Sequence, residues 1–303
     1  MLPSLPQRRG LRRLPSIGSI VLALAVPAIA AGEPPPVFEC GWEYCCNTYP
    51  VAITVGRGGN VCVATKWFTH GDVNEYGGEC GFVAYLGTFD RTPSGVAVDD
   101  SGFVYVASQQ CNCVLKLSDP IVVWGDTGSA PGQFDGLHGI AIDNEGCVYA
   151  ADRRNHRVQK LLRDGTPIAS FGDYGTGPGQ LAEPYAVAVD RAGHFYVTDV
   201  QNKRVQKYTT AGAFVTEWGV PGSEPGQFDQ PSGITADGRG GVFVADFGNA
   251  RVQKFSDTGE FLTSWTFPDS SLCWMWRQTG KEGSTSWTPS GRSRSSGRRL
   301  VAP

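Results

Sequence analysis

The chain carries nearly the same six residues three times: "NHRVQK" at 155–160, "NKRVQK" at 202–207 and "NARVQK" at 249–254. The copies stand 47 residues apart each time. A catalytic device is needed once, whereas a phrase that recurs at a fixed period marks a structural unit stacked on copies of itself. The spacing therefore predicts a repeat protein.

Each repeat unit holds four short apolar runs separated by turn residues. In the second clear copy the runs cover residues 186–189, 195–198, 204–208 and 214–218. β-branched and aromatic residues dominate them, and none has the period or length of a helix. One four-stranded antiparallel sheet cannot bury both its faces alone. We therefore predict an all-β protein in which such sheets stack around an axis as the blades of a β-propeller.

Three stretches carry a family resemblance: "PSGVAVDDSGFVYVAS" from residue 93, "GLHGIAIDNEGCVYAADRRNHRVQ" from 136 and "PSGITADGRGGVFVADFGNARVQKF" from 231. They resemble NHL repeats. The resemblance implies a propeller, usually of six blades, that binds partners on one face. We expect the propeller over residues 50–268, with five recognisable repeats at about 50–90, 93–125, 137–172, 184–219 and 231–266.

Several side chains recur in the repeats, and recurrence favours a structural role over a ligand site. An aspartate ends the second strand and an arginine begins the third five residues later, so the two should pair across the hairpin and fix its turn. These pairs are Asp152 with Arg157, Asp199 with Arg204, and Asp246 with Arg251. An aromatic residue closes each clear unit, and we expect it to pack between blades rather than to bind sugar. The closing residues are Trp124, Phe171, Trp218 and Trp265.

Ligand specificity should lie where the blades differ. The residues just before each first strand are expected to line the mouth of the central channel; they are Val51, Ser94, His138, Tyr185 and Ser232. Residues 66–85 are predicted to form a long insertion in the first blade. Its aromatic and histidine side chains are a second candidate binding edge, with a loop packed on its own blade as the alternative. They are Trp67, Phe68, His70 and Tyr76.

An exported binding scaffold for a protein, peptide or glycan ligand is the function we expect, without catalytic residues, metal or cofactor. The alternative is a channel-mouth enzyme that resembles peptide-amidating lyases or lactonases and uses zinc or calcium. Of the four histidines, only His138 stands at a channel-mouth position. Residues 32–268 hold 16 Lys and Arg against 27 Asp and Glu, a net charge of −11. That charge argues against a nucleic-acid partner.

The N-terminal residues 1–31 read as a secretory signal peptide, with four arginines followed by an apolar run and Ala28-Ile29-Ala30. We therefore expect a secreted or periplasmic protein without a stable membrane span after cleavage. A Cys-rich segment, 32–49, follows. In an oxidising compartment the cysteines before residue 150 should form disulfides rather than a metal cluster, with pairings left open. These are Cys40, Cys45, Cys46, Cys62, Cys80, Cys111, Cys113 and Cys147.

The C-terminal residues 269–303 leave the repeat pattern and read as a disordered, basic, low-complexity tail. A sixth blade would otherwise be due here. In the reading frame that begins one base earlier, the codons of Trp274-Met275-Trp276 encode Asp and Val, and those of Trp287-Thr288 encode another Asp. Their spacing agrees with the strand-and-turn pattern of a blade. We therefore hypothesise that residues from about 273 onward are a frameshifted sixth blade.

Overall fold

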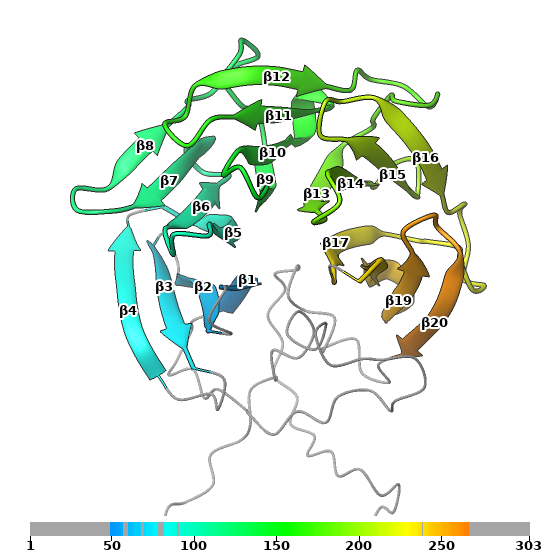
Figure 1. The fold of residues 1–303 in the computed structure, drawn as a ribbon, viewed down its shortest axis with the longest axis horizontal. Coiled ribbons are helices and arrows are strands. Elements are labelled where there is room, and N and C mark those ends of the chain that lie inside the picture. The colour runs from blue at the N-terminus through cyan, green and yellow to red at the C-terminus, as the bar shows by residue number, and fades with distance from the viewer. Residues whose placement is uncertain are drawn as a thin grey trace, which may run out of the picture.

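The computed structural model describes residues 49–56, 60–67, 70–77, 82–89, 91–237 and 239–266. These residues form five four-stranded antiparallel sheets, and within each sheet the strands follow one another in chain order. The sheets are arranged around a common centre as blades of a β-propeller, with the first strand of each blade innermost (Figure 1). The predicted all-β propeller is confirmed.

The five blades have the following bounds. Blade 1 comprises β1 (Tyr49–Val55), β2 (Val61–Trp67), β3 (His70–Tyr76) and β4 (Phe82–Phe89). Blade 2 comprises β5 (Pro93–Val98), β6 (Val104–Ser108), β7 (Cys113–Leu117) and β8 (Val122–Trp124). Blade 3 comprises β9 (Leu137–Ile142), β10 (Val148–Asp152), β11 (Arg157–Leu161) and β12 (Pro167–Phe171). Blade 4 comprises β13 (Pro184–Val189), β14 (His194–Asp199), β15 (Arg204–Thr209) and β16 (Phe214–Trp218). Blade 5 comprises β17 (Pro231–Ala236), β18 (Gly241–Asp246), β19 (Arg251–Ser256) and β20 (Phe261–Thr266).

The second strand of each blade is mostly apolar because both faces of a blade inside the ring are covered. In β10, all five residues are buried. Val148 packs in the cluster between blades 2 and 3, and the next residue, Tyr149, packs in the cluster between blades 3 and 4. Successive side chains of a strand point to opposite faces, so a strand covered on both faces requires a largely apolar run. The polar exception in β10 is Asp152, which pairs with Arg157.

The innermost strands hold the ring together. β1 contacts β5, β5 contacts β9, β9 contacts β13 and β13 contacts β17. Among the described residues the series stops there, and Figure 1 shows the ring open between blade 5 and blade 1. The expected tail at 269–303 and the hypothetical sixth blade lie outside the described residues, as do residues 1–31 and most of the segment 32–49.

The prediction of a long insertion at residues 66–85 is wrong. Those residues contribute the end of β2, all of β3 and the start of β4, so blade 1 has ordinary strands there. Trp67 ends β2 and His70 and Tyr76 bound β3, while Phe68 lies outside the described residues. The strand was missed because "HGDVNEY" has only Val73 as a buried aliphatic side chain.

Two of the expected disulfide cysteines are free thiols. Cys62 and Cys147 are buried and unbonded, whereas Cys111 and Cys113 form a disulfide with their Cα atoms 5.2 Å apart. Cys62 faces the apolar cluster between blades 1 and 2, and Cys147 faces the cluster between blades 3 and 4. Both act as small apolar side chains of the core. Cys40, Cys45, Cys46 and Cys80 lie outside the described residues.

Candidate functional site

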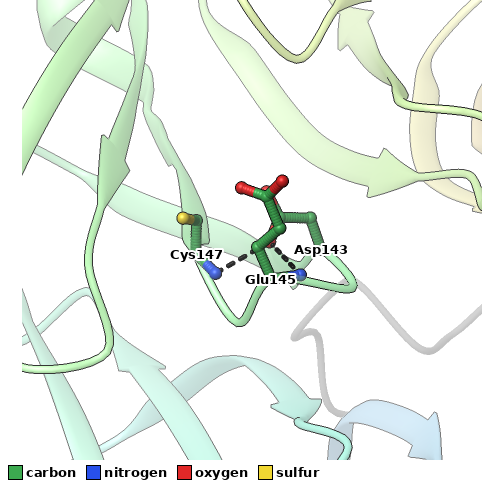
Figure 2. A group of neighbouring side chains, drawn as sticks. All are labelled: Asp143, Glu145 and Cys147. Atoms are coloured by element: carbon green, nitrogen blue, oxygen red, sulfur yellow. Dashed lines mark hydrogen bonds between the residues drawn. The ribbon is translucent and has the colours of Figure 1, made fainter.

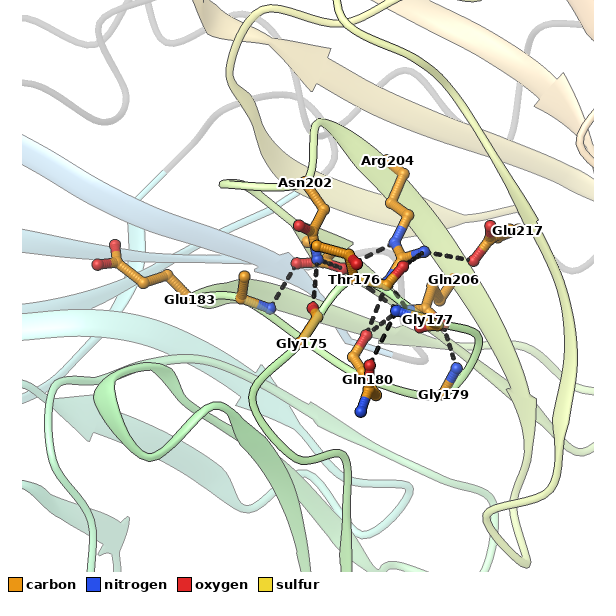
Figure 3. A network of polar contacts seen from close by, with 12 residues as sticks. Gly175, Thr176, Gly177, Gly179, Gln180, Glu183, Asn202, Arg204, Gln206 and Glu217 are labelled. Atoms are coloured by element: carbon orange, nitrogen blue, oxygen red, sulfur yellow. Dashed lines mark hydrogen bonds and ion pairs between the residues drawn. The ribbon is translucent and has the colours of Figure 1, made fainter.

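The recurring Asp–Arg pairs are buried ion pairs that join each blade to the loop before it, and we call them Asp–Arg locks. In blade 4, Asp199 is fully buried, and its Oδ2 accepts hydrogen bonds from Arg204 Nε at 2.9 Å and Asn202 Nδ2 at 2.8 Å. Arg204 also donates to the carbonyl oxygens of Gly177 and Gln180 in the preceding loop (Figure 3).

The same lock recurs in blades 3 and 5. Arg157 Nε lies 2.7 Å from Asp152, and Arg251 Nε lies 2.9 Å from Asp246. Both aspartates are fully buried. Because these charges are already satisfied inside the fold, they are not available to a ligand.

Three of the four closing aromatic residues lie inside the blade junctions. Trp124, Phe171 and Trp218 each pack on a glycine of the next blade; these glycines are Gly165, Gly212 and Gly259. A Cβ atom on those glycines would lie 2.3, 2.2 and 2.7 Å from the ring. Trp265 instead stacks on Phe243 of its own blade, with ring centroids 6.1 Å apart. The three rings inside the junctions form no open shelf.

One group of possible metal ligands occurs among the described residues: Asp143, Glu145 and Cys147, whose ligand atoms lie within 4.8 Å of one another (Figure 2). Asp143 Oδ1 already accepts the backbone N–H groups of Glu145 and Cys147, at 3.0 and 2.8 Å. Lys160 Nζ lies 3.4 Å from Asp143 Oδ2. Burial raises the pKa of the Cys147 thiol, which favours the neutral form that binds metals poorly. The arrangement serves the β9–β10 turn, and Asp190 makes the same turn in blade 4.

Three of the five residues expected at the channel mouth direct their side chains into contacts within this chain. Ser94 Oγ donates to the Leu137 carbonyl at 3.0 Å, and Ser232 Oγ donates to the Ala245 carbonyl at 3.3 Å. Val51 packs against the apolar cluster between blades 1 and 2. These side chains tie strands together.

The other two residues expected at the channel mouth contact each other. His138 is the second residue of β9, and Tyr185 is the second residue of β13. The centroids of their rings lie 3.7 Å apart, and the ring planes form an angle of 30°. His138 is 7% exposed. Burial, with a smaller contribution from the Arg153 charge, lowers the pKa of His138 to about 3, so its imidazole is neutral at physiological pH.

Arg153 and Glu183 extend this contact outward, and the sequence reading did not identify them. The Arg153 guanidinium lies 5.8 Å from the Tyr185 ring centroid, and its Nε and Nη2 both donate to Glu183 Oε2, the former at 3.0 Å. The signal was available in the repeat: Val200 and Phe247 hold the place of Arg153 in the next two blades. Figure 3 shows the Glu183 side chain directed away from the Arg204 network.

His156 and Tyr174 complete the series. Glu183 has a positive φ of 56°, and its backbone N–H donates to His156 Nδ1 at 3.2 Å. The His156 ring contacts Tyr174, with centroids 4.7 Å apart, and Tyr174 is 69% exposed. A continuous series of contacts thus runs from the surface to the innermost strands. We name it the blade 3–4 strip; it consists of His138, Arg153, His156, Tyr174, Glu183 and Tyr185.

The comparisons with known proteins agree with the repeat. The family model described as NHL repeat matches residues 134–161, 181–208 and 228–255, so these three segments are NHL repeats. NHL repeat-containing protein 3 from Homo sapiens is 36% identical over 82 residues, and its Mus musculus counterpart is 35% identical over 82 residues. Each alignment covers 25% of this chain and 23% of the relative, so the chain matches less than a quarter of the curated relatives' length.

Solved structures of similar fold include two lyases. A virginiamycin B lyase from Staphylococcus aureus is 18% identical, with 74% of this chain and 72% of that chain covered at a TM-score of 0.57. A streptogramin B lyase is 18% identical, with 73% and 69% covered at a TM-score of 0.56. A Bacteroides caccae protein of unknown function is 12% identical, with 79% and 88% covered at a TM-score of 0.56. At such identities the likeness concerns the fold. In the described part of this chain no helix has the length and apolarity needed to cross a membrane.

Proposed function

We propose that this protein is a binding scaffold that holds a protein, peptide or glycan ligand on the blade 3–4 strip. One observation carries the proposal: side chains that break the repeat touch one another in series, from exposed Tyr174 to buried His138. The repeated polar and aromatic residues are engaged in contacts within the fold, so a ligand must bind to side chains that differ between the repeats.

The composition of the strip supports binding. Tyrosine and arginine are enriched among the residues that dominate binding energy at interfaces. The Arg153 and Glu183 side chains are 31% and 25% exposed, so both reach solvent while remaining held in place. A non-glycine residue at positive φ is uncommon, and such conformations cluster at ligand sites. Glu183 adopts one at φ 56°, and Gly136 has a φ of 70° in the same place one blade earlier, so what distinguishes the strip is a charged side chain at a position where the repeat accepts glycine.

Paired arginine variants test this proposal. Arg153→Ala removes a member of the strip, and Arg154→Ala removes the same charge from the adjacent position, where the side chain is 64% exposed and pairs with Asp135. Purified wild-type protein and both variants are applied to peptide and glycan arrays. We expect Arg153→Ala to lose the strongest signals and Arg154→Ala to keep them. Equal losses in both variants would remove the strip from consideration.

A metal-dependent propeller enzyme is the second candidate. His138, which we expect at the channel mouth, has a neutral imidazole, and this favours the enzyme because neutral histidine is the form that binds metals. Metal analysis of wild-type protein and His138→Ala separates the candidates. Stoichiometric zinc or calcium that is lost in the variant would replace the scaffold proposal, and only trace metal in both supports it.

Export from the cytoplasm is part of the same proposal. The Cys111–Cys113 disulfide supports it, because disulfides persist in oxidising compartments. Mass spectrometry of the protein recovered from the culture medium or periplasm tests it. We expect a mature N-terminus close after Ala30, and an intact Met1 in the cytoplasmic fraction alone would contradict it.

We also propose that the ring is designed for six blades. Blade 4 meets blade 5 through Tyr196 and Trp218, which share one apolar cluster with residues of blade 5. Blade 5 carries Phe243 and Trp265 at the corresponding positions, 47 residues later. Sequencing the transcript that encodes residues 267–303 tests this idea. A strand-like valine and tyrosine run in the alternative frame supports it, and an early stop there refutes it.

A further inference from the structure

We propose that the ligand of the blade 3–4 strip is a cationic peptide segment, whose lysine or arginine side chain packs on Tyr174 beside Asp173. This inference rests on the proposed function and adds the chemical class of the partner. It is carried by an exposed aromatic ring, by the exposed acid beside that ring, and by two polar atoms that make no hydrogen bond within the described part of the chain.

Tyr174 offers a ring for a cation. Part of the ring contacts His156, and the residue remains 69% exposed. The same loop position holds Thr127 one blade earlier and Pro221 one blade later, each in the same backbone bridge. The aromatic ring is therefore not required by the loop. Lysine and arginine bind tyrosine faces through the negative charge of the π system.

The loops that connect one blade to the next carry exposed acids, and one of these acids lies beside Tyr174. Cations near these loops are already paired: Arg153 with Glu183, Arg154 with Asp135 and Lys203 with Asp229. Three acids in the connections between blades are exposed and have no described cation as partner; they are Asp126, Asp173 and Glu224. Asp173 directly precedes Tyr174. A positively charged segment is attracted to such an edge, and an anionic one is repelled.

Arg153 and Glu183 can hold the main chain of the same segment. Both hydrogen bonds between them use Glu183 Oε2, and within the described part of the chain Oε1 and Arg153 Nη1 make no hydrogen bond. A peptide amide has one N–H to donate to Oε1 and one carbonyl oxygen to accept from Nη1. The strip therefore presents matching polar atoms beside the ring that would take the cationic side chain.

Fluorescence anisotropy with defined peptides tests the inference. The probes are three labelled nonapeptides of glycine and serine that carry four lysines, four glutamines or four glutamates. We expect the lysine peptide to bind tightest, with affinity that falls as salt rises. Tyr174→Ala should weaken it roughly three- to tenfold, and Tyr174→Phe should restore it because the ring is kept. Asp173→Asn should weaken it as well, whereas Asp126→Asn, at the same position one blade earlier, should leave it nearly unchanged.

The outcomes separate this inference from the proposed function. Equal binding of the lysine and glutamine peptides, or equal effects of Asp173→Asn and Asp126→Asn, would overturn the cationic partner. If a neutral peptide or a glycan binds in a manner lost in Tyr174→Ala, the inference fails and the scaffold proposal stands. If Tyr174→Ala and Arg153→Ala both bind every probe and array ligand as wild type does, both fail. Unchanged thermal midpoints of the variants show that each comparison concerns folded protein.

Discussion

Replacing Asp199 by alanine would leave a buried guanidinium without its main counter-charge. Arg204 is 7% exposed, and Asp199 accepts hydrogen bonds from it, from Asn202 and from the backbone N–H of Ala182 at 2.7 Å. The carbonyl oxygens that also accept from Arg204 stay in place. The substitution therefore removes the carboxylate and keeps the arginine in its buried position.

The expected loss of stability is large. Removing one partner of a buried ion pair costs about 3–5 kcal/mol, and we expect a loss toward the lower end of that range because Glu217 still pairs with the guanidinium. A typical domain has a free energy of unfolding of about 5–15 kcal/mol, so the loss takes a large share of it. Glu217 provides the matched control: it pairs with the same guanidinium at 2.7 Å, but its side chain is 36% exposed. Glu217→Gln should cost about 0–1 kcal/mol, as surface ion pairs do.

Urea unfolding followed by tryptophan fluorescence measures both variants against wild type. The comparison uses the free energy of unfolding extrapolated to water, with the slope on urea checked for constancy. Asp199→Ala should unfold at much lower urea, and Glu217→Gln close to wild type. If the two variants lose equal stability, or if Asp199→Ala loses less than about 1 kcal/mol, the ion pair does not hold the blade and its loop together.

Three further results are expected. As pH falls from 6.5 to 5, the free energy of unfolding of the wild type should decrease more steeply than that of His138→Asn, by up to about 1.4 kcal/mol per pH unit. The reason is that histidine in the unfolded chain protonates near pH 6.5, whereas folded His138 has a pKa of about 3. Parallel curves for the two proteins would contradict the burial of a neutral imidazole. Cys62 and Cys147 should resist iodoacetamide in the native protein and react after unfolding in guanidinium, as peptide mass spectrometry can show, because both are buried and burial raises the pKa of both thiols; alkylation under native conditions would refute this. Gly212→Ala should destabilise by about 1–3 kcal/mol more than Gly193→Ala in thermal unfolding. Both glycines have positive φ, but a Cβ at 212 would lie 2.2 Å from the closing aromatic ring of blade 3, whereas at 193 its nearest neighbour is 3.8 Å away; equal losses would show that the ring yields.

The candidate site was half visible in the sequence. His138 and Tyr185 stood out because they break the repeat at a position that a propeller brings toward its axis. Arg153 also differs from its counterparts in the other blades, but it follows the recurring Asp152 in a turn whose pattern indicates a structural role. Glu183 was hidden for another reason: it stands where the preceding blade has Gly136, both with positive φ, and its contacts with Arg153 and His156 follow only from the packing of two blades.

The first blade shows the opposite limit. "HGDVNEY" lacks the apolar alternation of a strand, and yet β3 forms because β2 and β4 pair with it on both sides. The cysteines show the same limit, because spacing cannot tell which thiols face an apolar cluster and which face each other. Cys111 and Cys113 are close along the chain, whereas Cys147 meets the side chains of another blade.

The repeat by itself determined the all-β class, the four strands of each clear blade and the Asp–Arg locks, because those features need only neighbours within one unit or its fixed-period copies. Only the tertiary structure decided which of the side chains that differ between repeats come into contact. Tyr174, His156 and Glu183 come from a loop, a turn and a strand entry of two different blades, and only the packing of those blades brings them into contact. Contacts between units depend on how the sheets are oriented around the axis, and a linear pattern of side chains does not encode that geometry residue by residue.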